Sequence, residues 1–194
     1  MYNIIITGSL GSGKSSVASI LKHKSYSVFS ADIIINNIYE DGIFKKEMAN
    51  IFSLTEKQVS KKSISDIAFK DQAKLKKLEK LLYPELNKRV KQHKELCKQK
   101  KSLYFFYEAP VFFEKKETTD YDCVLVVSAN KEHCESRLLK KNMSKQKFDK
   151  IYNMQIPIQK KEELADYVIF NNSNLLDLKD KTKLFLKFLK QKYE

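Results

Sequence analysis

A chain of 194 residues, of which 42% are hydrophobic and 31% charged, has the length and composition of a globular protein with one sizeable core. No apolar stretch approaches the ~18 residues that a membrane-spanning helix needs, and no basic segment precedes the first apolar run, so we expect a cytoplasmic protein without a membrane role. The net charge of +13 comes from 35 lysines and only 2 arginines; because nucleic-acid readers favour arginine, we expect a solvated lysine surface and no nucleic-acid partner.

Short segments rich in apolar, β-branched and aromatic residues predict strands, and they alternate with segments of helical period. The expected strands are Asn3–Thr7, Ser27–Ser30, Leu103–Glu108, Cys123–Ser128 and Tyr167–Asn171. Because strands that alternate with helices usually form parallel sheets, we predict an α/β fold with a five-stranded parallel sheet flanked by helices.

The intervals between these strands are unequal. About seventy residues without a strand signal separate the second strand from the third, which is too long for a simple crossover helix. We therefore expect residues 33–101 to form a helical insertion and the basic helical stretch 137–163 to form a second separate segment. The core domain would then consist of residues 1–32, 102–136 and 164–194.

The first strand continues into Gly8-Ser9-Leu10-Gly11-Ser12-Gly13-Lys14-Ser15, and an amphipathic helical segment follows. This is the pattern G-x-x-x-x-G-K-[ST] in the strand–loop–helix setting that a phosphate-binding loop requires. Three of the four glycines of the chain stand in this pattern, where a backbone without Cβ atoms can approach phosphate closely. The loop's N–H groups and the helix N-terminus favour a bound anion. The motif therefore predicts a P-loop fold with a nucleotide-phosphate site.

The residues of this loop have separate expected roles. The set expected to bind the phosphates of ATP consists of Gly8, Gly11, Ser12, Gly13, Lys14, Ser15 and Ser16. Within it, the ammonium group of Lys14 would lie between the β- and γ-phosphates, and the hydroxyl of Ser15 would ligate Mg²⁺.

Two carboxylates stand at the ends of later strands. Asp32 follows the second strand and Glu108 ends the third. The carboxyl ends of strands line the ligand crevice of an open α/β sheet. There Asp32 could accept a proton or help to hold Mg²⁺, and Glu108 could belong to the metal shell. Asp32 could equally cap a helix that begins at Ile33, and the spacing leaves both alternatives open.

Arg137 is a candidate for the cation that phosphoryl transfer needs, because a planar guanidinium group suits phosphate oxygens better than an ammonium group does. A surface ion pair with Glu135 or its neighbours is the alternative. Arg89, the other arginine, lies in the insertion and is expected to be a surface residue.

Taken together, these residues resemble the dephospho-CoA kinase family over nearly the whole chain. The resemblance rests on residues 6–18, Ala31-Asp32, Leu78-Glu79, Tyr83-Pro84, Pro110–Glu114, Arg137-Leu138, Gln155 and Ala165–Asn171. It implies that ATP, with Mg²⁺, phosphorylates the ribose 3′-hydroxyl of dephospho-CoA in the last step of coenzyme A biosynthesis. It also implies that residues 33–101 bind the acceptor and that residues 137–163 form a lid over ATP.

The resemblance further implies roles for single residues. Asp32 would be the catalytic base, acting with Lys14 and Arg137 on the transferring group. The acceptor contacts that it implies, besides Asp32, are Tyr83, Glu108 and Pro110. The lid contacts that it implies are Lys141 and Lys161. The chain departs from the family pattern at four places: Ser30 and Glu108 replace aspartates, Asn36 an arginine and Tyr83 a histidine.

Two other functions remain open from the sequence. Another P-loop small-molecule kinase, for nucleosides, nucleoside monophosphates or shikimate, would share the loop but need a different acceptor pocket in residues 33–101. A nucleic-acid-associated ATPase is suggested only by the net charge of +13. The sequence makes no prediction of the oligomeric state.

Overall fold

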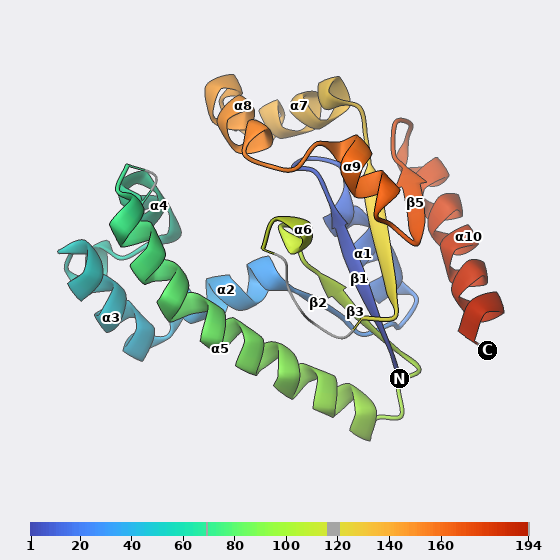
Figure 1. Ribbon diagram of the computed structural model, residues 1–194, viewed down its shortest axis with the longest axis horizontal. Coiled ribbons are helices and arrows are strands. Elements are labelled where there is room, and N and C mark those ends of the chain that lie inside the picture. The colour runs from blue at the N-terminus through green and yellow to red at the C-terminus, as the bar shows by residue number, and fades with distance from the viewer. Residues whose placement is uncertain (69, 116–120, 194) are drawn as a thin grey trace. The chain divides into compact units, whose positions relative to one another are not determined.

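The computed structural model describes residues 1–68, 70–115 and 121–193, and each of its strands is followed along the chain by one or more helices (Figure 1). The strands are β1 (Tyr2–Gly8), β2 (Val28–Ser30), β3 (Tyr104–Glu108), β4 (Cys123–Ser128) and β5 (Tyr167–Phe170). The helices are α1 (Lys14–His23), α2 (Ala31–Glu40), α3 (Gly42–Phe52), η1 (Glu56–Gln58), α4 (Lys61–Ala68), α5 (Gln72–Gln99), α6 (Phe112–Lys115), α7 (Lys131–Leu139), α8 (Lys145–Asn153), α9 (Ile158–Glu163) and α10 (Leu175–Tyr193). The five strand predictions are confirmed, each with its ends displaced by at most one residue.

The strands hydrogen-bond in the order β2-β3-β1-β4-β5. β1 pairs in parallel with β3, where Ile6 stands opposite Glu108, and with β4, where Gly8 stands opposite Val127. β4 pairs in parallel with β5. Because these strands run in one direction, the residues that follow β1, β3, β4 and β5 lie at the same edge of the sheet. The predicted five-stranded α/β fold is confirmed.

The core lies on both faces of the central strands. β3 and β4 are buried along their whole length, as is typical of a sheet covered by helices on each side. α1 packs on β1, β3 and α10, whereas α9 packs on β4. The buried face of α1 consists of the residues that the helical period predicts, together with the lysine of the loop motif: Lys14, Val17, Ala18, Ile20 and Leu21.

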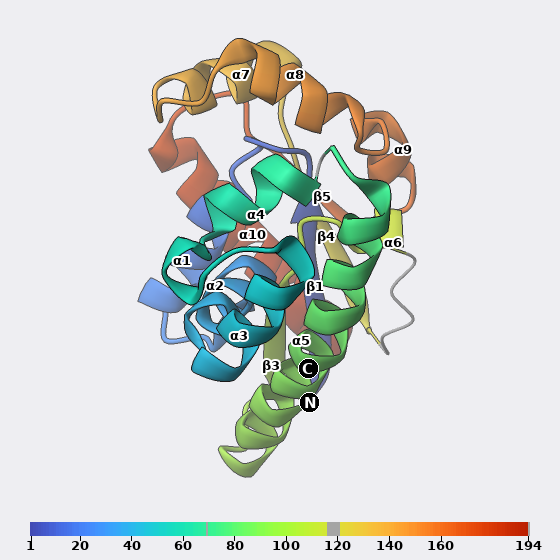
Figure 2. The same ribbon diagram turned by 90° about the vertical axis from the view of Figure 1, so that its left-hand side faces the viewer.

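The chain divides into two compact units, one of Met1–Val28 with Lys101–Glu194 and the other of Phe29–Lys100. In the larger unit, α7, α8 and α9 follow one another at the end where β1 and β4 finish (Figures 1 and 2). In the smaller unit, α2, α3 and α4 each pack on the 28-residue helix α5.

Among the described residues, every helix is too short or too polar to cross a membrane.

Arg89 holds two helices of the smaller unit together. From α5, its guanidinium group donates to Glu85 at 2.7 Å and to Asp41 at 3.1 Å, and Asp41 also caps the start of α3. The hydrogen bond from Arg89 lowers the pKa of the Glu85 carboxyl. Arg89 is therefore half-buried in an ion-pair network and is less exposed than the sequence predicts.

Candidate phosphate-binding site

The loop between β1 and α1 has a backbone that only glycines accommodate easily. Gly11 and Gly13 have φ angles of +79° and +105°. A Cβ atom on Gly11 would lie 2.7 Å from the carbonyl oxygen of Cys134, and one on Gly13 would lie 2.2 Å from Nδ2 of Asn171. Neither position therefore accepts a side chain without moving its neighbours. Gly13 is also the N-cap residue of α1, so the helix begins where an anion is favoured.

The side chain of Lys14 lies within this loop. Its ammonium nitrogen is 3.0 Å from the carbonyl oxygen of Gly8 and 2.8 Å from that of Ser9, and the residue is only 8% exposed. The buried hydroxyl of Ser12 has no hydrogen-bond partner among the described residues. Both groups fit an anionic ligand in the loop. The ammonium group of Lys14 can exchange its neutral carbonyl acceptors for charged oxygens, and the hydroxyl of Ser12 is available as a donor.

Ser15 and Glu108 form a pair of oxygen donors beside the loop. The hydroxyl of Ser15 donates to Oε1 of Glu108 at 2.8 Å, and Glu108 is only 4% exposed. The described residues hold no group of three His, Cys, Asp or Glu side chains that could bind a metal by themselves. Mg²⁺ usually takes one or two protein ligands together with phosphate oxygens. The hard oxygens of Ser15 and Glu108 fit that kind of site.

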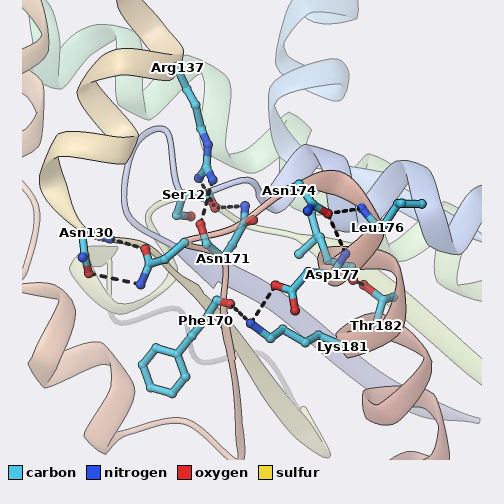
Figure 3. A network of polar contacts seen from close by, with 12 residues as sticks. Ser12, Asn130, Arg137, Phe170, Asn171, Asn174, Leu176, Asp177, Lys181 and Thr182 are labelled. Atoms are coloured by element: carbon cyan, nitrogen blue, oxygen red, sulfur yellow. Dashed lines mark hydrogen bonds and ion pairs between the residues drawn. The ribbon is translucent and has the colours of Figure 1, made fainter.

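Arg137 lies on α7, and its guanidinium group contacts backbone carbonyl groups. It donates to Asn171 at 2.7 Å and to Ser12 at 3.4 Å (Figure 3). It also donates to Gly11 at 3.5 Å. The alternative ion pair with Glu135 is wrong, because Glu135 pairs with a lysine of α8 at 2.9 Å. The guanidinium group therefore lies on the carbonyl side of the loop.

Lys161, the other expected lid contact, lies on α9 and is buried. Its side chain is 0% exposed, and its ammonium nitrogen is 2.6 Å from Oε1 of Glu114. The same carboxylate oxygen accepts a hydrogen bond of 3.1 Å from the N–H of Ile156, between α8 and α9. In this structure Lys161 belongs to an internal ion pair that joins α9 to α6.

Replacing Lys161 by methionine is expected to lower the free energy of unfolding by about 3–5 kcal/mol, because it leaves the Glu114 carboxylate without its cation in a largely buried position. Urea denaturation of the purified protein measures this loss. The double variant K161M/E114Q removes both charges and should recover much of the stability. A loss of less than about 1 kcal/mol in K161M, as for an exposed ion pair, would contradict the burial of this pair.

Lys141 is exposed and follows α7. Together with Ser15, Ser16, Leu175 and Lys179 it lines a cavity of about 750 Å³ that begins beside the loop. Lysines, hydroxyls and an aliphatic side chain in one cavity can accept a ligand with both anionic and apolar parts.

In the smaller unit, Asp32 lies in the first turn of α2. The capping alternative is wrong, because α2 begins at Ala31 and Ser30 occupies the N-cap position. The Asp32 carboxylate is exposed, and the ammonium nitrogen of Lys61 is 3.8 Å from it and 3.2 Å from Oδ1 of Asn36. An accessible carboxylate thus stands beside a cation that the sequence did not single out.

Tyr83 and Pro110, the other expected acceptor contacts, belong to different units. Tyr83 is half-buried in α5, directly before Pro84, and Pro110 is half-buried between β3 and α6. Their contact with the acceptor stays a prediction.

A model of the dephospho-CoA kinase family matches residues 2–177. The chain belongs to the dephospho-CoA kinase family. The dephospho-CoA kinase of Aquifex aeolicus is 34% identical over 184 residues, which cover 90% of this chain and 91% of that protein. The dephospho-CoA kinase of Helicobacter pylori is 31% identical over 191 residues, with 96% of each chain covered.

Solved structures share the fold of this chain. A Thermus thermophilus protein, 27% identical, has a TM-score of 0.83 with 97% of each chain covered. The dephospho-CoA kinase of Campylobacter jejuni is 23% identical, with a TM-score of 0.70 and coverage of 99% of this chain and 98% of that one. A shikimate kinase of Acinetobacter baumannii, 15% identical, has a TM-score of 0.52 with 100% and 96% covered, which shows the shared P-loop kinase fold alone.

Three further residues of this dephospho-CoA kinase family member, two of them in contact with the loop, had no function predicted from the sequence. Asn171 donates from Nδ2 to the carbonyl oxygen of Ser12 at 2.8 Å, and Gln155 accepts from the N–H of Leu10 at 2.8 Å. Glu114 is the partner of the buried lysine of α9. All three lie in segments that carry the family resemblance, and that was the available signal.

Proposed function

We propose that this chain transfers the γ-phosphoryl group of ATP to the ribose 3′-hydroxyl of dephospho-CoA, giving ADP and coenzyme A. The observation that supports it best is the loop itself, in which a buried lysine and a hydroxyl–carboxylate pair accompany the glycine backbone. The family match over residues 2–177 supports the choice of acceptor.

At the donor end, the phosphates of ATP bind along the segment from Gly11 to Ser16. Lys14 exchanges its two backbone acceptors for oxygens of the β- and γ-phosphates. Ser15, with Glu108 beside it, would hold Mg²⁺, which would offset negative charge on the phosphates. The nucleoside continues into the cavity that Ser16 and Leu175 line.

Replacing Glu108 by glutamine is expected to raise the Mg²⁺ concentration for half-maximal activity about 10–100-fold, as for other residues that orient a metal ligand. Glutamine keeps the shape of the side chain and can still accept the hydrogen bond from Ser15, so folding should be little affected. A Mg²⁺ titration at saturating ATP measures the effect, with the exposed Glu163→Gln variant as a control. An unchanged Mg²⁺ requirement would remove Glu108 from the metal site.

At the acceptor end, residues 33–101 bind dephospho-CoA, and Asp32 takes the proton of the attacking hydroxyl. The exposure of the Asp32 carboxylate supports this role, and Lys61 keeps positive charge near it. Tyr83 and Pro110 are proposed contacts for the acceptor.

Residues 137–163 form the proposed lid, which excludes water and so limits ATP hydrolysis. Lys141, exposed at the cavity, is its proposed phosphate contact. Arg137 can steady the transferring phosphoryl group only after it releases the loop carbonyls that it contacts.

A panel of acceptors tests the proposal against its alternatives. Purified protein with Mg·ATP should form ADP rapidly with dephospho-CoA and slowly with adenosine, AMP, shikimate or no acceptor. A higher kcat/KM for any other acceptor would overturn the assignment. ATPase activity that DNA or RNA stimulates in a strongly salt-dependent way would favour the nucleic-acid alternative.

A further inference from the structure

Asn171, directly after β5, has a backbone that is held on both sides. Its N–H donates to the carbonyl oxygen of Ser128 at 2.7 Å. The preceding carbonyl, of Phe170, accepts from Lys181 of α10 at 2.7 Å (Figure 3). The residue is only 4% exposed. Its side chain therefore starts from a fixed point at the carboxyl edge of the sheet.

The side chain of Asn171 reaches the phosphate-binding loop. Nδ2 donates to the carbonyl oxygen of Ser12 at 2.8 Å (Figure 3). Since a carbonyl oxygen can only accept, the amide nitrogen and not the amide oxygen must face it. A Cβ atom on Gly13 would lie only 2.2 Å from the same nitrogen, which is too close for two atoms that are not bonded. The absence of a side chain at Gly13 is thus what admits the amide.

Arg137 strengthens the same contact from α7. Nη2 donates to the carbonyl oxygen of Asn171 at 2.7 Å, and Nη1 lies 3.4 Å from the carbonyl oxygen of Ser12. The Ser12 carbonyl therefore receives one short bond from the amide and one longer, charged bond. The shorter of the two bonds comes from Asn171.

A hydrogen bond to the carbonyl oxygen of Ser12 also sets the direction of the N–H of Gly13. The peptide unit that joins Ser12 to Gly13 is planar and trans, so its C=O and N–H point in opposite directions. Holding the carbonyl toward Asn171 consequently turns the N–H of Gly13 the other way, toward the concave side of the loop where anions bind.

We propose that Asn171 is a positioning residue for the donor nucleotide, because its amide group fixes the peptide between Ser12 and Gly13 in the orientation that binds phosphate. The proposal rests on the proposed kinase function for its turnover assay, although nucleotide binding tests it independently. Without the amide donor, the peptide between Ser12 and Gly13 has no fixed orientation before the nucleotide binds. Ordering it on binding costs free energy, so ATP binds more weakly, whereas binding of the acceptor is unchanged.

Two substitutions separate positioning from a merely structural role. N171D keeps the size of the side chain but places a carboxylate oxygen against the Ser12 carbonyl, whereas N171A removes the donor and retains the backbone hydrogen bonds. N172D is the matched control for the change in charge, since Asn172 is exposed and its side chain hydrogen-bonds to Asn130 and not to the loop. Thermal unfolding reports whether each variant is folded.

We expect N171D and N171A to raise KM for ATP and Kd for Mg·ADP about tenfold, the usual effect of a lost or opposed buried hydrogen bond. KM for dephospho-CoA should stay unchanged, and N172D should behave as the wild type. In N171D the increase in Kd for Mg·ADP should become smaller as pH falls, because a protonated carboxyl group can again donate to Ser12. In N171A the increase should not depend on pH.

An unchanged Kd for Mg·ADP in folded N171A would overturn the proposal, as would equal increases in both KM values that do not vary with pH in N171D. If N171D does not fold, the Kd for Mg·ADP of N171A still tests the proposal. If wild-type protein binds Mg·ADP but does not phosphorylate dephospho-CoA, the proposed function fails, and the comparison of Kd values still tests Asn171.

Discussion

Replacing Lys14 by methionine lowers kcat by at least about 10²–10³-fold, the loss expected when a preorganised charge on the transferring group is removed. The ammonium group is already inside the loop, 3.0 Å from the carbonyl oxygen of Gly8 and 8% exposed, so no other cation replaces it without rearrangement. Steady-state kinetics with saturating ATP and dephospho-CoA measure the effect.

Lys22→Met is the matched control for this variant, because Lys22 lies on the same helix, α1, and is exposed. It should retain nearly full kcat. A Lys14→Met protein that is folded and keeps more than about a tenth of the wild-type kcat would show that the loop lysine does not act on the transferring phosphoryl group.

Replacing Asp32 by asparagine should lower kcat by about 10²–10⁴-fold, because the attacking hydroxyl loses its proton acceptor. The carboxylate is exposed and pairs only loosely with Lys61, at 3.8 Å, so its loss should hardly affect stability. Kd for Mg·ATP should stay near the wild-type value, since the phosphate-binding loop is unchanged.

Asp66→Asn provides the control, because Asp66 is an exposed aspartate of the same unit on α4. It should leave kcat and both KM values unchanged. Near-full kcat in Asp32→Asn would remove Asp32 as the base and require another proton acceptor for the 3′-hydroxyl.

The strands and the phosphate-binding loop could be predicted because their signals are local. The run from β1 through Gly13 to α1 is contiguous, and its residue types leave few other conformations. The strand predictions are confirmed for the same reason, since a short buried strand shows as an apolar run bounded by polar residues.

The surroundings of the loop could not be predicted, because they depend on contacts between distant segments. Asn171 and Ser12 are 159 positions apart, and Arg137 and Gly11 are 126 apart. Burial of Lys161 likewise depends on Glu114, a residue of another helix. Periodicity indicates that a lysine lies on a helix but not which acid it meets.

The first residue of α2 was also not predicted correctly from the sequence. The sequence suggested a helix from Ile33 with Asp32 as a possible cap, whereas α2 begins at Ala31 with Ser30 as its N-cap residue. Serine and aspartate are both good N-cap residues, so composition alone does not choose between them.

The most direct measurement is mass spectrometry of dephospho-CoA after incubation with the purified chain and Mg·ATP. The proposed function predicts that the acceptor gains the mass of one phosphoryl group at the ribose 3′-position, with one ADP formed for each product molecule. ADP formation without any phosphorylated dephospho-CoA would contradict it.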